Sequence, residues 1–110
     1  AAFYNNLLTQ AAAQHLTKIF TLGSGGVEIQ FPDGQHRIYP AFAVDVYTTH
    51  GAGDMFVGAL AARCLAGDRF DVALRYAQAA AALHVAADLN QRKTLTSADV
   101  IRFLQAQTNP

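Results

Sequence analysis

The sequence predicts an α/β fold, a layered sheet flanked by helices, and three features of its pattern support this prediction. Residues 18–22 form a short apolar run, rich in strand-forming side chains, that ends at a glycine. Residues 27–31 and 37–39 alternate apolar and polar side chains on either side of a Pro-Asp-Gly turn. Residues 54–66 and 71–87 consist almost entirely of helix-forming residues. Strands and helices of these lengths are typical of elements packed in layers around one core.

The first elements make one helix-to-strand step of such a fold. Apolar side chains recur on one helical face across residues 3–15, which predicts a helix. Residues 18–22 then predict a buried strand, closed by the glycine turn. The alternating runs around Pro32-Asp33-Gly34 predict a β-hairpin. Residues 41–47 are apolar except for one aspartate, and we expect them to return toward the core as an extended segment.

The second half of the chain predicts three helices. Gly67 stands just past residues 54–66, where a helix commonly ends. The next helix, residues 71–87, carries an alanine run from Ala79 to Ala82, and these small side chains permit close packing. Thr96-Ser97-Ala98-Asp99 has the pattern of a capping box and predicts the start of the last helix.

Composition excludes several classes of function. The chain of 110 residues is 52% hydrophobic and 15% charged, enough apolar surface for a folded core. Its formal net charge is zero without a basic stripe, which argues against nucleic-acid binding. Apolar stretches are interrupted too often to span a bilayer, so no membrane attachment is expected. The single cysteine, Cys64, fits a reducing cytoplasm. The four histidines are too dispersed to predict a metal site.

The most informative stretch is Gly51-Ala52-Gly53-Asp54, which stands immediately before a long helical pattern. Two glycines allow unusual backbone conformations and let a ligand approach the main chain. Unpaired N–H groups and the positive end of the helix dipole form an anion site at such a helix start. A carboxylate there favours its ionised form, which suits a proton acceptor. Anion donors beside a base are the minimum requirement for a small-molecule kinase.

A simpler interpretation remains open at this point. Glycine turns often precede helices, and an aspartate at a helix start is frequently only a cap. The stretch is also neither a Walker A motif nor Gly-x-Gly-x-x-Gly. His50, next to the turn, is either a substrate contact or a plain loop residue. Farther along, we interpret His84 as a packing residue of an apolar helix. We interpret Arg92 as a solvated side chain, which with Lys93 could at most touch the nucleotide phosphates.

A family resemblance favours the kinase. Thr-x-Gly-Ala-Gly-Asp-x-Phe-x-Gly-Ala, from Thr49 to Ala59, closely resembles the C-terminal signature of the ribokinase-like (phosphofructokinase-B type) carbohydrate kinases. Residues 20–27 resemble the strand and glycine segment of that family, residues 76–83 the helix that borders its adenine pocket, and residues 96–104 its closing helix. The resemblance thus covers nearly the whole chain, in the same order and spacing.

The resemblance implies a fold, a reaction and roles for particular residues. It implies the C-terminal portion of a layered α/β/α fold with a mainly parallel sheet, spanning residues 1–110 of a longer kinase. ATP with Mg²⁺ would phosphorylate a hydroxyl of a sugar or related alcohol, with Asp54 as the general base. The anion hole would be formed by Gly51, Ala52 and Gly53. The other nucleotide contacts would be three glycines by the phosphates or ribose and one glutamine by the adenine: Gly23, Gly25, Gly26 and Gln78.

Two departures from the family pattern bear on these expectations. Thr48 stands where the family usually has an aspartate that helps bind a monovalent ion, which argues against potassium activation. Residues 88–95 lack the Gly and Pro common near the adenine loop of the family. The family's acidic metal motif and most sugar contacts would come from the remainder of the kinase chain, so we expect no activity from residues 1–110 alone. A homodimer is one assembly that the parent enzyme could adopt.

The alternative is a non-catalytic nucleotide-binding or regulatory domain, or an inactive fragment of such a kinase. An intact Asp54 and an intact glycine turn favour an active parent enzyme. A domain without catalysis has no need of the base, and an asparagine at this position would have pointed the other way.

Overall fold

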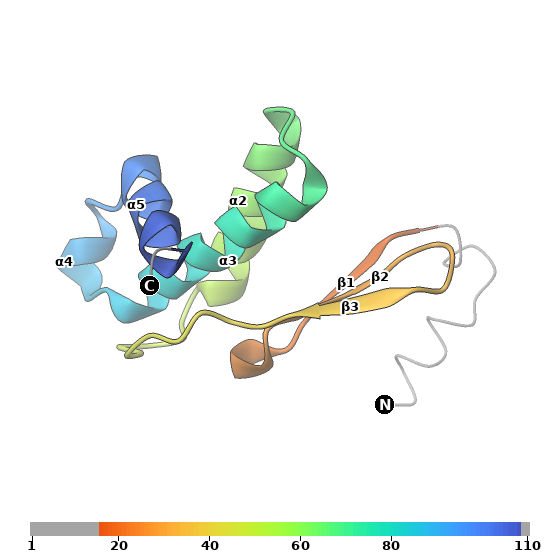
Figure 1. Ribbon diagram of the computed structural model, residues 1–110. Helices are drawn as coiled ribbons and strands as arrows, with labels where there is room; N and C mark the ends of the chain where they lie inside the picture. Colours follow the sequence, from red (N-terminus) through yellow and green to blue (C-terminus); the bar gives the residue numbers. More distant parts are fainter. Residues whose placement is uncertain (1–15, 109–110) are drawn as a thin grey trace. The chain divides into compact units, whose positions relative to one another are not determined.

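The computed structural model describes residues 16–108, and the chain divides into two compact units at the junction of Ala41 and Phe42 (Figure 1). The first unit holds a small sheet and the second a group of helices. The helix predicted for residues 3–15 lies outside the described residues.

The sheet of the first unit has three strands in the order β1-β2-β3. They are β1 (Lys18–Thr21), β2 (Val27–Gln30) and β3 (His36–Tyr39). Strands β2 and β3 pair antiparallel, with Val27 opposite Tyr39, so the predicted hairpin is confirmed. Alternate side chains of β2 point into the core, and Ile29 is fully buried.

The pairing of β1 with β2 differs from the expectation of a mainly parallel sheet, because it too is antiparallel. A tight turn, the short 3-10 helix η2 (Gly23–Gly25), is the reason. The Leu22 amide donates to the Gly26 carbonyl across it, at 2.8 Å. A parallel neighbour would need a crossover of about a dozen residues or more, and this turn is far too short. Strand β1 also alternates between half-buried and exposed residues, whereas the sequence predicted a buried strand.

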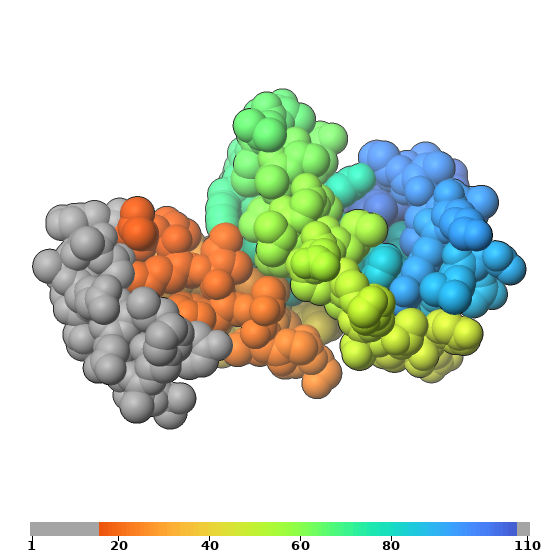
Figure 2. Space-filling view, turned by 180° about the vertical axis from the view of Figure 1, so that it is seen from behind, coloured from red at the N-terminus to blue at the C-terminus, as the bar shows by residue number. Residues whose placement is uncertain are grey.

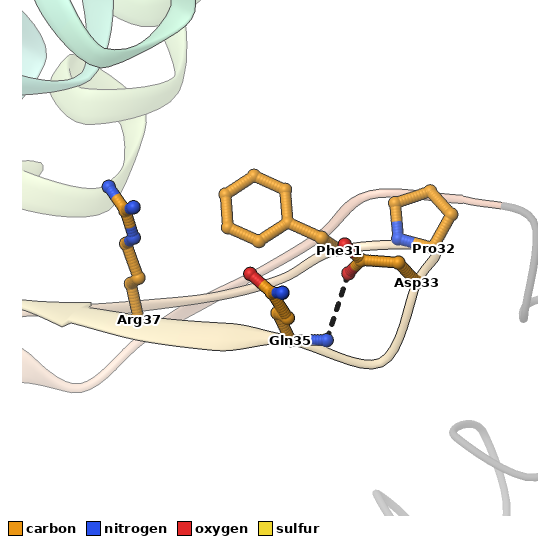
Figure 3. Close-up of a pocket in the computed structure, with 5 residues that line it drawn as sticks. All are labelled: Phe31, Pro32, Asp33, Gln35 and Arg37. Carbon is orange, nitrogen blue, oxygen red and sulfur yellow. Dashed lines mark hydrogen bonds between the residues drawn. The ribbon is translucent and has the colours of Figure 1, made fainter.

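The loop that joins β2 to β3 borders a surface hollow of the first unit. Phe31, Pro32, Asp33, Gln35 and Arg37 line it, and Figure 3 shows their side chains along the hairpin. The Gln35 amide donates to Asp33 Oδ1 at 2.9 Å, which holds the turn predicted from Pro-Asp-Gly. This hollow contains none of the residues that the sequence singled out for function.

The second unit is built on a pair of long helices, α2 (Ala52–Leu65) and α3 (Phe70–Ala86). They run antiparallel and are joined by a short turn (Figure 1). Helix α2 ends as predicted, with Gly67 in the left-handed region at φ 93°. The Gly67 amide donates to the Cys64 carbonyl and the Asp68 amide to the Arg63 carbonyl, the two hydrogen bonds of a Schellman motif.

The alanine face of α3 forms the centre of the packing in this unit. Ala79 and Ala80 are buried together with Val100 of α5 (Ser97–Thr108). Small side chains let the helix backbones approach closely, which is the role predicted for the alanine run. Phe42 and Phe103 pack edge-to-face beside this cluster, with ring centroids 5.3 Å apart.

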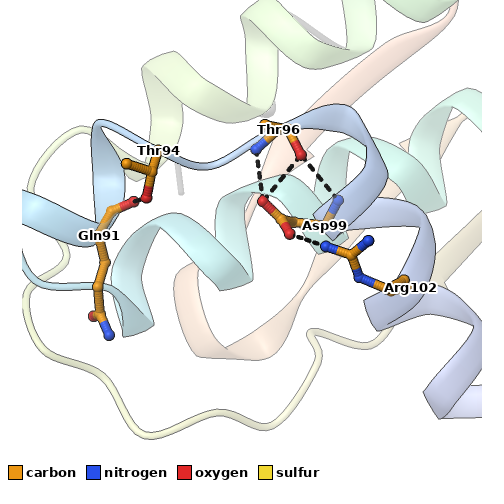
Figure 4. A network of polar contacts seen from close by, with 5 residues as sticks. All are labelled: Gln91, Thr94, Thr96, Asp99 and Arg102. Atoms are coloured by element: carbon orange, nitrogen blue, oxygen red, sulfur yellow. Dashed lines mark hydrogen bonds and ion pairs between the residues drawn. The ribbon is translucent and has the colours of Figure 1, made fainter.

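The predicted capping box of α5 is present. Thr96 donates its amide to Asp99 Oδ2 at 2.9 Å, and Asp99 donates its amide to Thr96 Oγ1 at 3.3 Å (Figure 4). The Thr96 amide and the Thr96 hydroxyl, which both donate to the Asp99 carboxylate, hold the pKa of Asp99 below its usual range, and an ion pair with Arg102 adds to the effect. The Thr94 hydroxyl, which precedes the box, donates to the Gln91 carbonyl.

Residues 41–47 were expected to return toward the core, and Phe42 does pack against the core of the helical unit, but the segment forms no strand. Instead, the Tyr47 amide donates to the carbonyl of Val85 near the end of α3, at 2.7 Å. A short helix, α4 (Leu89–Arg92), follows α3 where the sequence predicted no element. Its Asp88 and Gln91 form a reciprocal capping box, which explains how four residues hold a helical turn.

No helix within residues 16–108 is long and apolar enough to cross a membrane.

Candidate functional site

The stretch Gly51-Ala52-Gly53-Asp54 forms the start of α2, as its sequence predicted. Gly51 is the N-cap residue and adopts a left-handed conformation, with φ 81° and ψ 1°. A side chain at this φ would be strained, so the turn requires glycine here. Asp54 falls in the first helical turn. Figure 2 shows the segment that leads into α2, in yellow-green, at the surface of this unit.

Two carbonyls of this segment are engaged by side chains from the end of α3 and from α4. Arg92 donates from Nη2 to the carbonyl of Thr48 at 3.2 Å. His84 lies 3.0 Å from the carbonyl of His50 through its Nε2 atom. A carbonyl can only accept, so Nε2 of His84 carries a hydrogen in this contact.

The two neighbouring carbonyls are engaged by backbone donors. The Thr49 carbonyl accepts from the Ala52 amide at 3.1 Å, and the Gly51 carbonyl accepts from the Met55 amide at 3.0 Å. The four successive carbonyls from Thr48 to Gly51 therefore all accept hydrogen bonds from the protein itself. The Ala52 amide is one of these donors, whereas the sequence predicted it as part of an anion hole.

Three backbone amides of the turn take no hydrogen-bond partner within the described part of the chain: those of Gly51, Gly53 and Asp54. The last two belong to the first turn of α2, where an α-helix lacks intrahelical acceptors and carries the positive end of its dipole. Because the carbonyls of the segment are already engaged, an anion at the turn would meet donors and little competing oxygen. The arrangement can bind a phosphate or similar group.

The carboxylate of Asp54 is exposed at the same helix start. It accepts no hydrogen bond and forms no ion pair within residues 16–108, so it is not serving as a cap. The other first-turn carboxylates differ, because Asp71 and Asp99 each accept from backbone amides. An unengaged carboxylate beside unengaged amides is available to an incoming hydroxyl.

Two side chains that hold this segment were not predicted from the sequence. His84 was expected to be a packing residue and Arg92 a solvated one, but they donate to the His50 and Thr48 carbonyls, respectively. Arg92 also donates from Nε to the His84 carbonyl at 2.8 Å, and its side chain is half-buried. Nothing in the sequence pattern indicates these contacts, because they join residues 34 and 44 positions apart.

Gln78, predicted beside the adenine, lies on α3 and is 6% exposed. Arg75 donates from Nη1 to its side-chain oxygen, and the Arg75 guanidinium stacks over the Phe42 ring at 4.0 Å. These contacts fix the Gln78 side chain within the helical unit. Its contact with adenine stays a prediction.

The other predicted nucleotide contacts belong to the first unit. Gly23 and Gly25 bound the short 3-10 helix after β1, and both are exposed. Gly26 is buried at φ 93°, and a Cβ there would lie 2.1 Å from the Tyr39 carbonyl oxygen. Glycine is thus required at this position by the turn itself. Nucleotide binding by these three residues stays a prediction.

Within residues 16–108, no three His, Cys, Asp or Glu side chains come together in a group that could hold a metal ion.

Comparison with known proteins places the chain in a family. Residues 4–96 match the pfkB family of carbohydrate kinases. The chain is 36% identical to the ribokinase of Haemophilus influenzae over 89 residues, which are 81% of this chain and 29% of that protein. A 61-residue stretch is 41% identical to the ATP-dependent ribose-1-phosphate kinase of Halopiger xanaduensis, covering 56% of this chain and 20% of that protein.

Solved structures agree. The chain superposes on the ribokinase of Thermotoga maritima with a TM-score of 0.72 and 30% identity, covering 81% of this chain and 30% of the other. The ribokinase of Arabidopsis thaliana, complexed with ribose and ATP, gives 0.73 and 27%, covering 81% and 29%. These similarities confirm the predicted ribokinase-like α/β fold. The chain spans about a third or less of the length of these relatives. It belongs to the pfkB family of carbohydrate kinases.

Proposed function

We propose that the protein carrying this chain transfers the γ-phosphoryl group of ATP to a hydroxyl of a sugar or sugar-like small molecule. A bond forms between the acceptor oxygen and the γ-phosphorus, the bond from that phosphorus to the β-phosphate oxygen breaks, and ADP leaves. Asp54 takes the proton of the acceptor hydroxyl. The backbone amides at the start of α2 stabilise the negative charge on the transferring group.

The single observation that carries this proposal is that, at one turn, the backbone acceptors are occupied by the described part of the protein while three backbone donors are not. Every carbonyl from Thr48 to Gly51 is engaged, while the amides of Gly51, Gly53 and Asp54 are not. A phosphoryl group in transfer carries charge on its equatorial oxygens and needs such donors. The unengaged carboxylate of Asp54 stands on the same turn, within reach of the hydroxyl that would attack.

The donors proposed here differ from the predicted set at one position. The amide of Ala52 is occupied by the Thr49 carbonyl, so Gly51, Gly53 and Asp54 are the proposed donors. Ala52 contributes through its small side chain, which leaves the ligand room to approach.

ATP and Mg²⁺ are the proposed cofactors. The Arabidopsis thaliana relative was solved with ribose and ATP, which supports the nucleotide and a pentose-like acceptor. Magnesium commonly binds through substrate phosphates and one or two carboxylates, and it would neutralise phosphate charge during transfer. Gly23, Gly25, Gly26 and Gln78 remain the proposed nucleotide contacts of this chain. The remainder of the kinase chain would supply most contacts to the acceptor.

The direct test is a panel of sugars, nucleosides and vitamin alcohols, assayed with MgATP and the complete gene product that contains this chain. We expect ADP formation that depends on one class of acceptor. The variant Asp54→Asn should then lose at least about a hundredfold in kcat while still binding ATP, the scale expected for loss of a general base.

The matched control is Asp71→Asn, which also changes an exposed carboxylate in the first turn of a helix. It should keep the wild-type rate. A near-wild-type rate for Asp54→Asn would remove this residue from catalysis. Nucleotide binding without phosphorylation of any acceptor would instead favour a non-catalytic, regulatory domain.

A further inference from the structure

We propose that Arg92 and His84 are positioning residues for the phosphoryl-binding turn, holding its carbonyls away from the transferring group. We call these two side chains the carbonyl clamp. The inference rests on the proposed function, because it assigns a task to residues that touch the turn and not the substrate. It begins from the four hydrogen bonds that join residues 47–50 to the end of α3 and to α4.

Arg92 is the centre of the clamp. Its guanidinium bridges two backbone segments, with Nε on the His84 carbonyl at 2.8 Å and Nη2 on the Thr48 carbonyl at 3.2 Å. The planar fork of arginine suits such a bridge, and charged donors form hydrogen bonds about twice as strong as neutral ones. No carboxylate within residues 16–108 pairs with Arg92, so its polar contacts in this region are backbone carbonyls.

The short helix α4 determines where the Arg92 side chain begins. Asp88 accepts from the Gln91 amide at 2.8 Å, and the Gln91 side chain accepts from the Asp88 amide at 2.8 Å. The Arg92 amide then donates to the Asp88 carbonyl at 3.0 Å. A helical turn of four residues would be unstable in isolation, so its complete capping box is needed to present this arginine. The role that we propose for α4 is therefore to position the Arg92 side chain.

His84 forms the second arm of the clamp. Its Nε2 donates to the carbonyl of His50, the residue just before the N-cap. The ring also packs against the turn, since a Cβ added to Gly51 would lie 2.9 Å from Nε2. With this carbonyl held by the ring, the peptide that joins His50 to Gly51 directs its N–H away from His84. That N–H is one of the three proposed phosphoryl donors.

Loss of the clamp should therefore act on the rate and spare substrate binding. If the Thr48 and His50 carbonyls are released, the peptide planes can rotate and present oxygens to a negatively charged group. This penalty falls chiefly on the transition state, where charge on the phosphoryl oxygens must be matched by donors. Loss of interactions made only in the transition state lowers kcat and kcat/KM together and leaves KM nearly unchanged.

The test uses Arg92→Ala and His84→Ala in the complete kinase, with steady-state kinetics for ATP and acceptor. We expect kcat to fall by about tenfold to a hundredfold with KM within about twofold, since a small misplacement of catalytic groups costs this much. Added guanidinium ion should restore part of the rate of Arg92→Ala. His84→Gln, whose amide can still donate, should retain more activity than His84→Ala.

Two controls separate positioning from folding. Arg102→Ala removes an exposed arginine that pairs with Asp99 on α5, and it should keep the wild-type rate and show no guanidinium rescue. Amide hydrogen exchange followed by mass spectrometry provides a readout besides activity. Peptides that cover residues 47–54 should exchange faster in both clamp variants, while the sheet peptides stay unchanged.

The outcomes distinguish failure of this inference from failure of the proposed function. An active wild type whose clamp variants keep their rate and their exchange pattern overturns the clamp alone. A wild type that phosphorylates no acceptor overturns the proposed function, and faster exchange in the variants would then still support the clamp as a structural device. A general rise in exchange over the whole protein, or an equal rescue of Arg102→Ala, would overturn the positioning role.

Discussion

The two glycines on either side of Ala52 serve different ends, although the sequence presents them as one motif. Gly51 has φ 81°, and a Cβ there would meet His84 Nε2 at 2.9 Å. Gly53 has no positive φ, and a Cβ there would meet no atom within 4 Å. The protein itself therefore needs glycine at 51 and tolerates a side chain at 53. The open space at Gly53 lies beside the proposed phosphoryl donors, so we expect an incoming ligand to use it.

This contrast gives a prediction at the residue scale. Gly51→Ala should destabilise the protein by about 1–3 kcal/mol, the cost of holding a non-glycine residue in a left-handed conformation. Gly53→Ala should leave the free energy of unfolding unchanged or slightly raised, since alanine suits a helix better. It should nonetheless lower kcat/KM at least about tenfold, because the methyl group stands where the phosphoryl group approaches.

Urea denaturation and steady-state kinetics of both variants measure the two effects. Full activity in Gly53→Ala would show that no ligand comes close to this backbone. An unchanged stability in Gly51→Ala would contradict the left-handed N-cap.

At the scale of elements, the ends of the helices matter more for the site than their lengths. The proposed phosphoryl donors lie in the first turn of α2, His84 near the end of α3 contacts the His50 carbonyl, and Arg92 of α4 contacts the Thr48 carbonyl. The last helix acts at a distance. Its capping box at Thr96 and Asp99 fixes where α5 begins, and α5 packs Val100 against the alanine face of α3.

The cap of α5 gives a prediction for this element. Thr96→Ala should lower the free energy of unfolding by about 1 kcal/mol, the usual effect of losing an N-cap side chain. Ser97→Ala, one residue later, is the matched control and changes a hydroxyl that bonds to Tyr76 and not to the helix start. Thermal or urea unfolding of both variants compares them, and equal losses would contradict the capping role of Thr96.

The same cap sets a dependence on pH. The amide and the hydroxyl of Thr96 hold the pKa of Asp99 below its usual range, so the folded state binds this proton less readily than the unfolded state. The contribution of Asp99 is therefore present at neutral pH and is lost as the pH falls through the lowered pKa. The difference in stability between wild type and Asp99→Ala should narrow in acid, and a difference that widens would contradict the assignment.

At the scale of the whole molecule, the chain corresponds to one part of its relatives. It spans 29% of the Haemophilus influenzae ribokinase and 30% of the Thermotoga maritima one. The described residues contain a proposed base and proposed phosphoryl donors, but no group of side chains that could hold a metal ion. In the proposed reaction, the remainder of the kinase chain would supply most contacts to the acceptor.

This division predicts that residues 1–110 alone do not phosphorylate a sugar. Positioning the acceptor hydroxyl against the γ-phosphoryl group supplies much of the rate in such reactions, and the isolated chain would lack that positioning. An assay of ADP formation with acceptors that the complete protein accepts makes the comparison. Robust turnover by the isolated chain would show that the rest of the protein is dispensable for catalysis.

The sequence by itself determined the local features of this protein. Gly67 ends α2, Thr96 and Asp99 begin α5, and the Pro-Asp-Gly turn joins β2 to β3, because each depends on contacts between residues close in the chain. The motif at residues 51–54 was predictable for the same reason. Its family followed from the order and spacing of several such motifs, and the comparisons confirm it.

Only the tertiary structure decided how the strands pair and which residues distant in the chain contact one another. The antiparallel pairing of β1 was set by the geometry of a tight turn, and the path of residues 41–47 by a hydrogen bond to the end of α3. The proposed positioning roles of His84 and Arg92 depend on hydrogen bonds to residues that are 34 and 44 positions away in the sequence, respectively. Hydrophobic periodicity carries no information about such polar contacts, because their donors and acceptors meet only once the helices have packed.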